Sequence, residues 1–234
     1  MDVQLQRLRA ISLVVMLPAF LLCSKLFSQD YKYEMGGMAG AASYVGDANP
    51  HRLFLRPGAS GGLLFRYNAN LQWAIKATLL GGTVSGETRD TRNRFPLGQH
   101  ESFQRAFAEV GSQVEFNFFR YSNEYEYLGT KHYTPYLFAG AGITLSGGNN
   151  SFLGVNVPFG IGFKYKLKNR VNIGAELSMR KLFRDDFDVV DNTAGWNLDA
   201  PFGIESSLLK NKDWYSLAMI YLTWDFGNRS DPCR

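Results

Sequence analysis

Apolar and polar residues alternate strictly over several stretches of this chain. From Leu71 to Leu79 every odd position is apolar, while Gln72, Lys76 and Thr78 occupy even positions. The stretch Val171 to Met179 repeats the pattern. A period of two residues puts the two sets of side chains on opposite faces of an extended segment. The pattern therefore predicts β-strands with one apolar and one polar face.

Eight candidate strands can be marked along the chain, of which the first is built mainly from small residues. They are Tyr33–Tyr44, Gly58–Tyr67, Leu71–Thr83, Phe103–Phe119, Tyr136–Leu145, Val157–Leu167, Val171–Phe183 and Trp214–Phe226. Most are longer than the roughly 5–6 residues typical of globular strands. They match a tilted membrane-spanning strand of about 9–11 residues with its ends. We therefore expect an eight-stranded antiparallel transmembrane β-barrel of the outer-membrane type.

The connections between these strands alternate in length. Two are tight turns, at 68–70 and 168–170, and four are long and polar, at 45–57, 84–102, 146–156 and 184–213. Outer-membrane barrels have short periplasmic turns and long external loops. With a periplasmic N-terminus, the tight turns face the periplasm and the long connections face outward.

One connection breaks this alternation, because Arg120–Pro135 is periplasmic by strand parity and yet long. It contains Tyr121, Glu124, Tyr125 and Tyr127. It is either an ordinary long loop or a contact surface for a periplasmic partner, and the sequence leaves both open.

A barrel in lipid turns its apolar face outward and its polar face inward, whereas a soluble β-sandwich or lipocalin does the reverse. Eight strands enclose only enough space for side chains. Charged residues on the polar faces would then lie inside and must pair, because an unpaired buried charge is costly. These predicted interior charges are Lys76, Glu109, Glu115, Lys164, Glu176 and Arg180.

Aromatic and glycine residues fit the same fold. Aromatic residues near predicted strand ends suit the interfacial girdles of such barrels. They are Trp73, Phe116, Phe118, Tyr136, Trp214, Trp224 and Phe226. Gly140, Gly142, Gly160 and Gly162 are followed by no predicted helix, so they do not form a nucleotide-binding loop. We expect them to make room for large interior side chains.

The N-terminus has the order of regions of an export signal. Arg7 and Arg9 precede the apolar run Ile11–Leu22, and Ser28 precedes the preferred cleavage point. A buried helix is the alternative. We therefore divide the chain into a signal peptide (1–28), a barrel (29–226) and a periplasmic tail (227–234). The processed chain is close to neutral, and export excludes a nucleic-acid partner.

Few residues of the chain are candidates for catalysis or metal binding. His51, His100 and His132 have no metal-ligand spacing, and neither His100 beside Ser102 nor His51 near Asp47 establishes catalytic geometry. We expect no enzyme activity, cofactor or metal. Cys233 is the only cysteine of the processed chain, which indicates an idle thiol or, as we favour, a disulfide to a periplasmic partner.

Four segments resemble a known family. They are Ala42–Asp47 (ASYVGD), Gly62–Asn68 (GLLFRYN), Glu115–Phe119 (EFNFF) and Thr134–Gly142 (TPYLFAGAG). They are similar to the PorG family of Bacteroidetes-type outer-membrane proteins, over about Tyr33 to Asp188. The Gly-Asp pair after the first strand and Arg66-Tyr67-Asn68 before the first turn are the most specific pieces. The latter part of 184–213 has no match in the family.

The resemblance implies an eight-stranded barrel of the type IX protein secretion system, linked to secretion or gliding. It implies a role without catalysis, in which the barrel anchors a periplasmic ring of a PorK-like lipoprotein and a PorN-like protein. Two alternatives stay open. One is a generic outer-membrane barrel with a role in adhesion or envelope stability, and the other is a lipid-modifying barrel enzyme.

Overall fold

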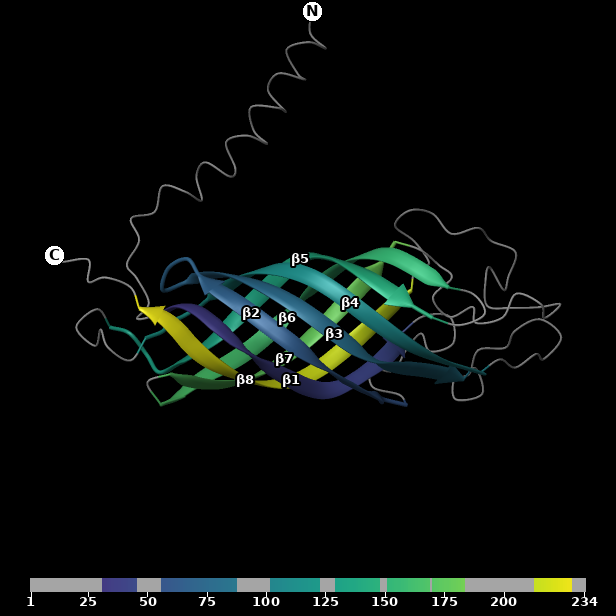
Figure 1. The fold of residues 1–234 in the computed structure, drawn as a ribbon, viewed down its shortest axis with the longest axis horizontal. Helices are drawn as coiled ribbons and strands as arrows, with labels where there is room; N and C mark the ends of the chain where they lie inside the picture. Colours follow the sequence, from purple (N-terminus) through teal and green to yellow (C-terminus); the bar gives the residue numbers. More distant parts are fainter. Residues whose placement is uncertain are drawn as a thin grey trace, which may run out of the picture.

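The computed structural model describes residues 31–45, 56–87, 102–122, 129–147, 151–168, 170–183 and 213–228. These residues form eight strands: β1 (Tyr31–Val45), β2 (Gly58–Asn68), β3 (Trp73–Glu87), β4 (Ser102–Asn117), β5 (Tyr133–Ser146), β6 (Phe152–Lys168), β7 (Val171–Leu182) and β8 (Trp214–Asn228). Each pairs with its sequence neighbours in antiparallel fashion, and β1 also pairs with β8, which closes the sheet. The predicted eight-stranded barrel is confirmed (Figure 1).

The two ends of the barrel differ. Tyr31, which begins β1, pairs with Asn228, which ends β8. The connections that follow β2, β4 and β6 start at this same end, at the left of Figure 1, and we call it the turn end. The connections that follow β1, β3, β5 and β7 start at the opposite end, the loop end.

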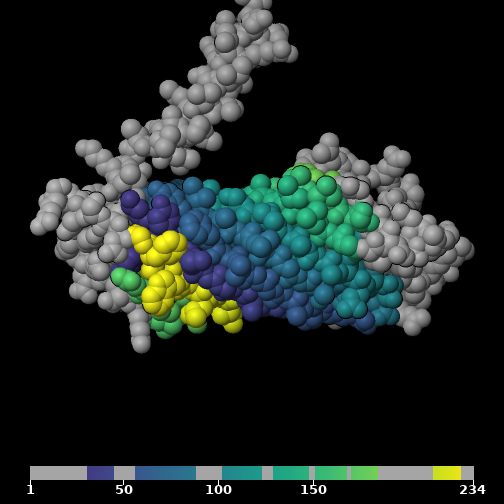
Figure 2. Space-filling model, in the orientation of Figure 1, coloured from purple at the N-terminus to yellow at the C-terminus, as the bar shows by residue number. Residues whose placement is uncertain are grey.

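Burial along the strands alternates with a period of two. In β4 every second residue from Phe103 to Asn117 is buried, and most residues between them are exposed. The exposed set is apolar, with Leu63 and Ile220 exposed by 62% and 64%, whereas the interior Lys76 is 0% exposed. Figure 2 shows the wall on one side as a continuous surface in which β8 lies against β1. The barrel is inside-out relative to a soluble protein, as expected for strands that span a membrane.

Several predicted boundaries were wrong. Strand β3 ends at Glu87 and not at Thr83, and β5 begins at Tyr133 and not at Tyr136. Strand β6 begins at Phe152 and not at Val157, so the predicted long connection 146–156 is short. The alternation continues through Leu153 and Val155, which face outward. It is hard to recognise in the sequence because the inward positions hold Gly154, which has no side chain, and the polar Asn156. Strand β3 begins at Trp73 and Leu71 is buried in the preceding turn. Strand β4 ends at Asn117, two residues early.

No helix within the described residues is long and apolar enough to cross a membrane. The predicted signal peptide lies outside those residues, as do positions 229–234 of the predicted tail.

Candidate functional site: the barrel interior and the turn end

A network of ion pairs fills the interior near the turn end, with Glu115 at its centre. Oε2 of Glu115 lies 2.9 Å from Nε of Arg66 and 3.4 Å from Nζ of Lys164, while Oε1 lies 3.3 Å from Nζ of Lys76. Lys76 also pairs with Glu176. Five side chains from five strands are therefore joined in one cluster, away from solvent.

The network extends to β1 through Glu34. Arg66 pairs with Oε2 of Glu34, and Asn68 Nδ2 donates to Oε1 of Glu34 at 2.8 Å. Arg66 and Asn68 are two of the three residues in the specific Arg-Tyr-Asn segment. Their side chains share an inward face because they are two positions apart. Closer to the turn end, Lys166 pairs with Asp225 at 3.0 Å.

A second polar cluster lies toward the loop end. Nε of Arg180 is 2.9 Å from Oε2 of Glu109, which also accepts a hydrogen bond from the Tyr215 hydroxyl. The Tyr215 hydroxyl is 2.8 Å from Thr144 Oγ1, to which Asn156 Nδ2 donates at 2.7 Å. In the described residues, six buried carboxylates face six buried Lys or Arg side chains, so the interior is balanced in charge.

Apolar side chains also point into the barrel, among the charged and polar ones. They are Met38, Leu64, Leu80, Phe138, Leu217 and Met219, and all belong to one buried hydrophobic cluster. Interior glycines accommodate the large rings beside them. A Cβ atom at Gly162 would overlap the ring of Tyr136, and one at Gly174 would overlap Tyr221. The space inside the described barrel is filled by side chains, as expected for eight strands.

The structure places all six predicted interior charges inside the barrel. Sequence reasoning missed six more buried charges: Glu34, Arg66, Arg105, Lys166, Asp213 and Asp225. Inward strand parity could have found most of these. The prediction of Tyr136 in an interfacial girdle was wrong, because this side chain is 1% exposed and its hydroxyl donates to Glu176 at 2.6 Å. Its neighbours Pro135 and Leu137 face outward, so Tyr136 must face inward.

The described parts of the connection after β4, residues 118–122 and 129–132, lie at the turn end. The Tyr121 amide donates to Leu71 O at 3.3 Å, and Tyr121 forms an isolated β-bridge with Lys131. The Tyr121 hydroxyl donates to Asn172 Oδ1 at 2.9 Å, and Lys164 lies 5.2 Å from its ring centroid. Burial raises the pKa of Tyr121 above its ordinary value. The sequence left open whether Tyr121 lies in an ordinary loop or on a partner-binding surface; in the structure its side chain is only 1% exposed and points into the turn end of the barrel.

Several predicted site residues lie outside the described part of the chain. They are Glu124, Tyr125, Tyr127, Cys233, His51 and His100. His132 lies exposed at the turn end, where its carbonyl accepts a hydrogen bond from the Lys166 amide at 2.8 Å. Within the described residues, no three His, Cys, Asp or Glu side chains gather closely enough to hold a metal ion.

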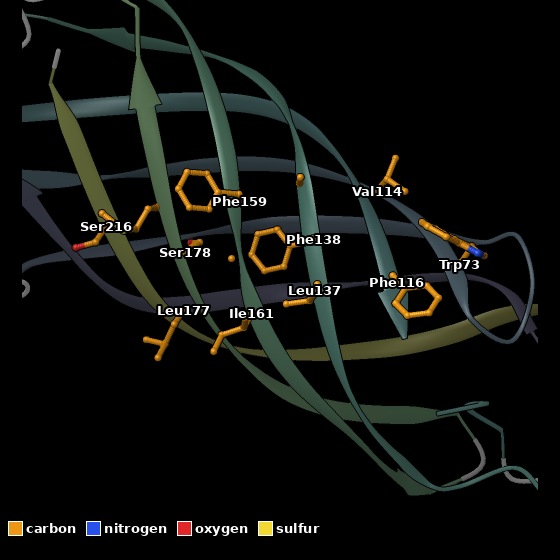
Figure 3. A pocket seen from close by; sticks show the side chains of 13 residues that line it. Trp73, Val114, Phe116, Leu137, Phe138, Phe159, Ile161, Leu177, Ser178 and Ser216 are labelled. Atoms are coloured by element: carbon orange, nitrogen blue, oxygen red, sulfur yellow. The ribbon is translucent and has the colours of Figure 1, made fainter. Parts of the chain in front are cut away.

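The outer surface forms a continuous apolar belt. Leu137, Ile161 and Leu177 pair in register on β5, β6 and β7, and Figure 3 shows them side by side at a groove on this surface. At the turn end, Tyr33 stacks on Phe226 with 5.5 Å between ring centroids. An apolar belt with aromatic ends around a charged interior can occupy a bilayer, and eight strands enclose about enough space for side chains.

A family model described as "Domain of unknown function (DUF6089)" matches residues 12–234. The chain belongs to this family. A comparison with curated proteins found no match.

Among solved structures, the DUF6089 chain is similar to three small barrels. Neisserial surface protein A is 11% identical, with 83% of this chain and 97% of that chain covered and a TM-score of 0.48. The attachment invasion locus protein Ail of Yersinia pestis is 12% identical, with 86% and 100% covered and a TM-score of 0.45. The outer membrane protein OprG of Pseudomonas aeruginosa is 11% identical, with 86% and 99% covered and a TM-score of 0.43.

Proposed function

We propose that this protein is a non-enzymatic structural component of the outer membrane that anchors a periplasmic ring of the type IX secretion system. In this proposal the turn end faces the periplasm and contacts a PorK-like lipoprotein, assembled with a PorN-like protein. The connection between β4 and β5 and the C-terminal tail make the contact, and Cys233 forms a disulfide to the partner. The long connections at the loop end face outward.

The observation that carries the proposal is that the interior is filled with side chains while one connection at the turn end is much longer than the others. A barrel whose interior holds paired charges and apolar side chains acts through its surfaces and not through a channel. At the turn end, β2 and β3 are joined by residues 69–72, and β6 and β7 by 169–170, whereas β4 and β5 are joined by 118–132. Tyr121 attaches this longer connection to the barrel, which favours a rigid base for a partner-binding segment.

The test is a pull-down of the tagged full chain in mild detergent, run on a non-reducing gel. We expect periplasmic ring proteins to co-purify, together with a disulfide-linked adduct that disappears in Cys233→Ser. A double variant Tyr125→Ala/Tyr127→Ala should lose the ring proteins, while Tyr165→Ala, on the outer belt, should retain them. A monomer without a partner, together with normal secretion after deletion, would refute the anchor and favour a generic barrel with a role in adhesion or envelope stability.

A further inference from the structure

An open strand edge lies at the loop end, on the side of β4 that faces β5. The end of β3 and the start of β4 lie side by side there and pair as far as Glu87 and Ser102 (Figure 1). The ladder between β4 and β5 stops earlier, at Phe107 and Ser146. The segment Ser102–Ala106 therefore extends past the end of β5 and has a paired strand on one side only.

The direction of the main-chain groups along β4 is set by its hydrogen bonds at the turn end. There the amide of Asn117 donates toward the β3 side at 2.6 Å, and the amide of Phe118 donates toward the β5 side at 3.1 Å. The N–H and C=O groups of successive residues point to opposite sides of an antiparallel strand, and the register of β4 against β3 is continuous. Even-numbered residues of β4 therefore direct both groups to the β5 side. On the open edge these residues are Ser102, Gln104 and Ala106.

The open edge has a depression beside it and lies where the apolar belt ends. Among the described residues, none forms a main-chain hydrogen bond with Gln104 or Ala106 from the β5 side. Both residues are exposed, and the outward positions change there from apolar Ala106 to polar Gln104. The depression is lined mainly by small and apolar residues, among them Ala106, Ala108, Leu145, Gly147 and Phe152. Unpaired peptide groups and a small apolar depression therefore occur together.

We propose that the open edge of β4 binds an extended peptide segment of a protein partner by β-strand addition. Gln104 and Ala106 each offer an N–H and a C=O group, and an extended peptide main chain pairs with both in register. An acyl chain fits less well because it cannot form hydrogen bonds with these groups. One apolar side chain of the peptide occupies the depression, and the side chain two positions away lies beside Gln104 and is polar. This inference does not depend on the secretion proposal, since it concerns the opposite end of the barrel.

The first test is a fluorescence anisotropy titration of the full chain in mild detergent with a short labelled peptide in which valine and threonine alternate. We expect saturable binding, which is lost when alternate amides of the peptide are N-methylated. Gln104→Pro removes one N–H of the edge and leaves the ladder with β3 intact, so it should weaken binding about ten-fold. Gln104→Ala is the matched control, because it keeps the N–H and should keep the affinity. Ala106→Trp fills the depression and should also weaken binding.

The second test is amide hydrogen exchange of the wild-type chain, followed by NMR in detergent micelles. The amides of Gln104 and Ala106 should exchange quickly in the free protein and slowly with the peptide bound. The amides of Phe103 and Arg105 point toward β3 and should exchange slowly in both states. Slow exchange of Gln104 and Ala106 without peptide would show that another part of this chain covers the edge, and would overturn the proposal. Absence of saturable binding, equal binding of the N-methylated peptide, or unchanged binding in Gln104→Pro would overturn it as well.

Discussion

Arg66 on β2 and Glu115 on β4 form an ion pair across the intervening strand β3, with 2.9 Å between Nε and Oε2. Lys76 on β3 and Lys164 on β6 contact the same carboxylate. A single buried anion therefore connects four strands of the barrel. Its removal takes away the carboxylate that pairs with Lys164, whereas Arg66 and Lys76 keep their ion pairs with Glu34 and Glu176.

We expect Glu115→Gln to destabilise the barrel by about 3–5 kcal/mol, the usual cost of removing one member of a buried ion pair. The free energy of unfolding, measured by urea titration in lipid vesicles, tests this. The control is Glu87→Gln, which removes the pair of Glu87 with Arg56, where the side chains are 21% and 48% exposed. An exposed pair contributes about 0–1 kcal/mol. Equal losses in the two variants would refute the central role of Glu115.

Gly162→Ala should also destabilise the barrel, because a Cβ atom at this position overlaps the ring of Tyr136. The ring must move away from Glu176, to which its hydroxyl donates. Overpacking of this kind costs roughly 1–3 kcal/mol. Gly37→Ala is the control, because a Cβ atom added at Gly37 would lie 3.9 Å from its nearest neighbour, the carbonyl oxygen of Gly62. Its free energy of unfolding should stay near that of the wild type. The same urea titration compares them, and a neutral Gly162→Ala would contradict the proposed fit of glycine to ring.

Period-two alternation was sufficient to predict most of the eight strands and their inward faces. It works in this fold because lipid and interior impose opposite chemistry on successive residues. The six predicted interior charges lie on strands such as β4, where Glu109 and Glu115 alternate with apolar neighbours. Their burial implied that these charges must form ion pairs. The sequence did not show which residues pair, because the partners lie on strands that are far apart in the sequence.

Other features had no periodic signal. Strand β1 is built mainly from small residues, so the inward position of Glu34 was not apparent. Tyr121 lies in a connection, where no alternation applies, and its contacts with Leu71 and Asn172 come from distant segments. The early start of β6 was concealed by Asn156, whose polar side chain was assigned to a loop although it donates to Thr144 inside the barrel.

A charged side chain on the outer belt should lower the stability of the barrel by an amount that depends on its depth in the bilayer. Ile161 lies near the middle of β6 and is 56% exposed, whereas Leu167 lies at the turn end of the same strand and is 52% exposed. A lysine at the bilayer midplane costs about 2–4 kcal/mol, and one near the interface about 0–1. We therefore expect Ile161→Lys to lower the free energy of unfolding in vesicles much more than Leu167→Lys. Similar losses would contradict the assigned position of the belt.

Tyr121 makes the stability of the barrel depend on pH in the alkaline range. Burial raises its pKa, and the carboxylates Glu34 and Asp225 add to the effect. In the unfolded chain a tyrosine ionises near pH 10, while native Tyr121 stays protonated to higher pH. Its contribution to stability is therefore complete below about pH 10 and decreases as the pH rises above that value. We expect the free energy of unfolding to fall more steeply between pH 9 and about pH 11 in the wild type than in Tyr121→Phe, which retains the ring without the ionisable group. Lysine titration affects both proteins equally, so parallel curves would show that the Tyr121 hydroxyl is not buried in the barrel mouth.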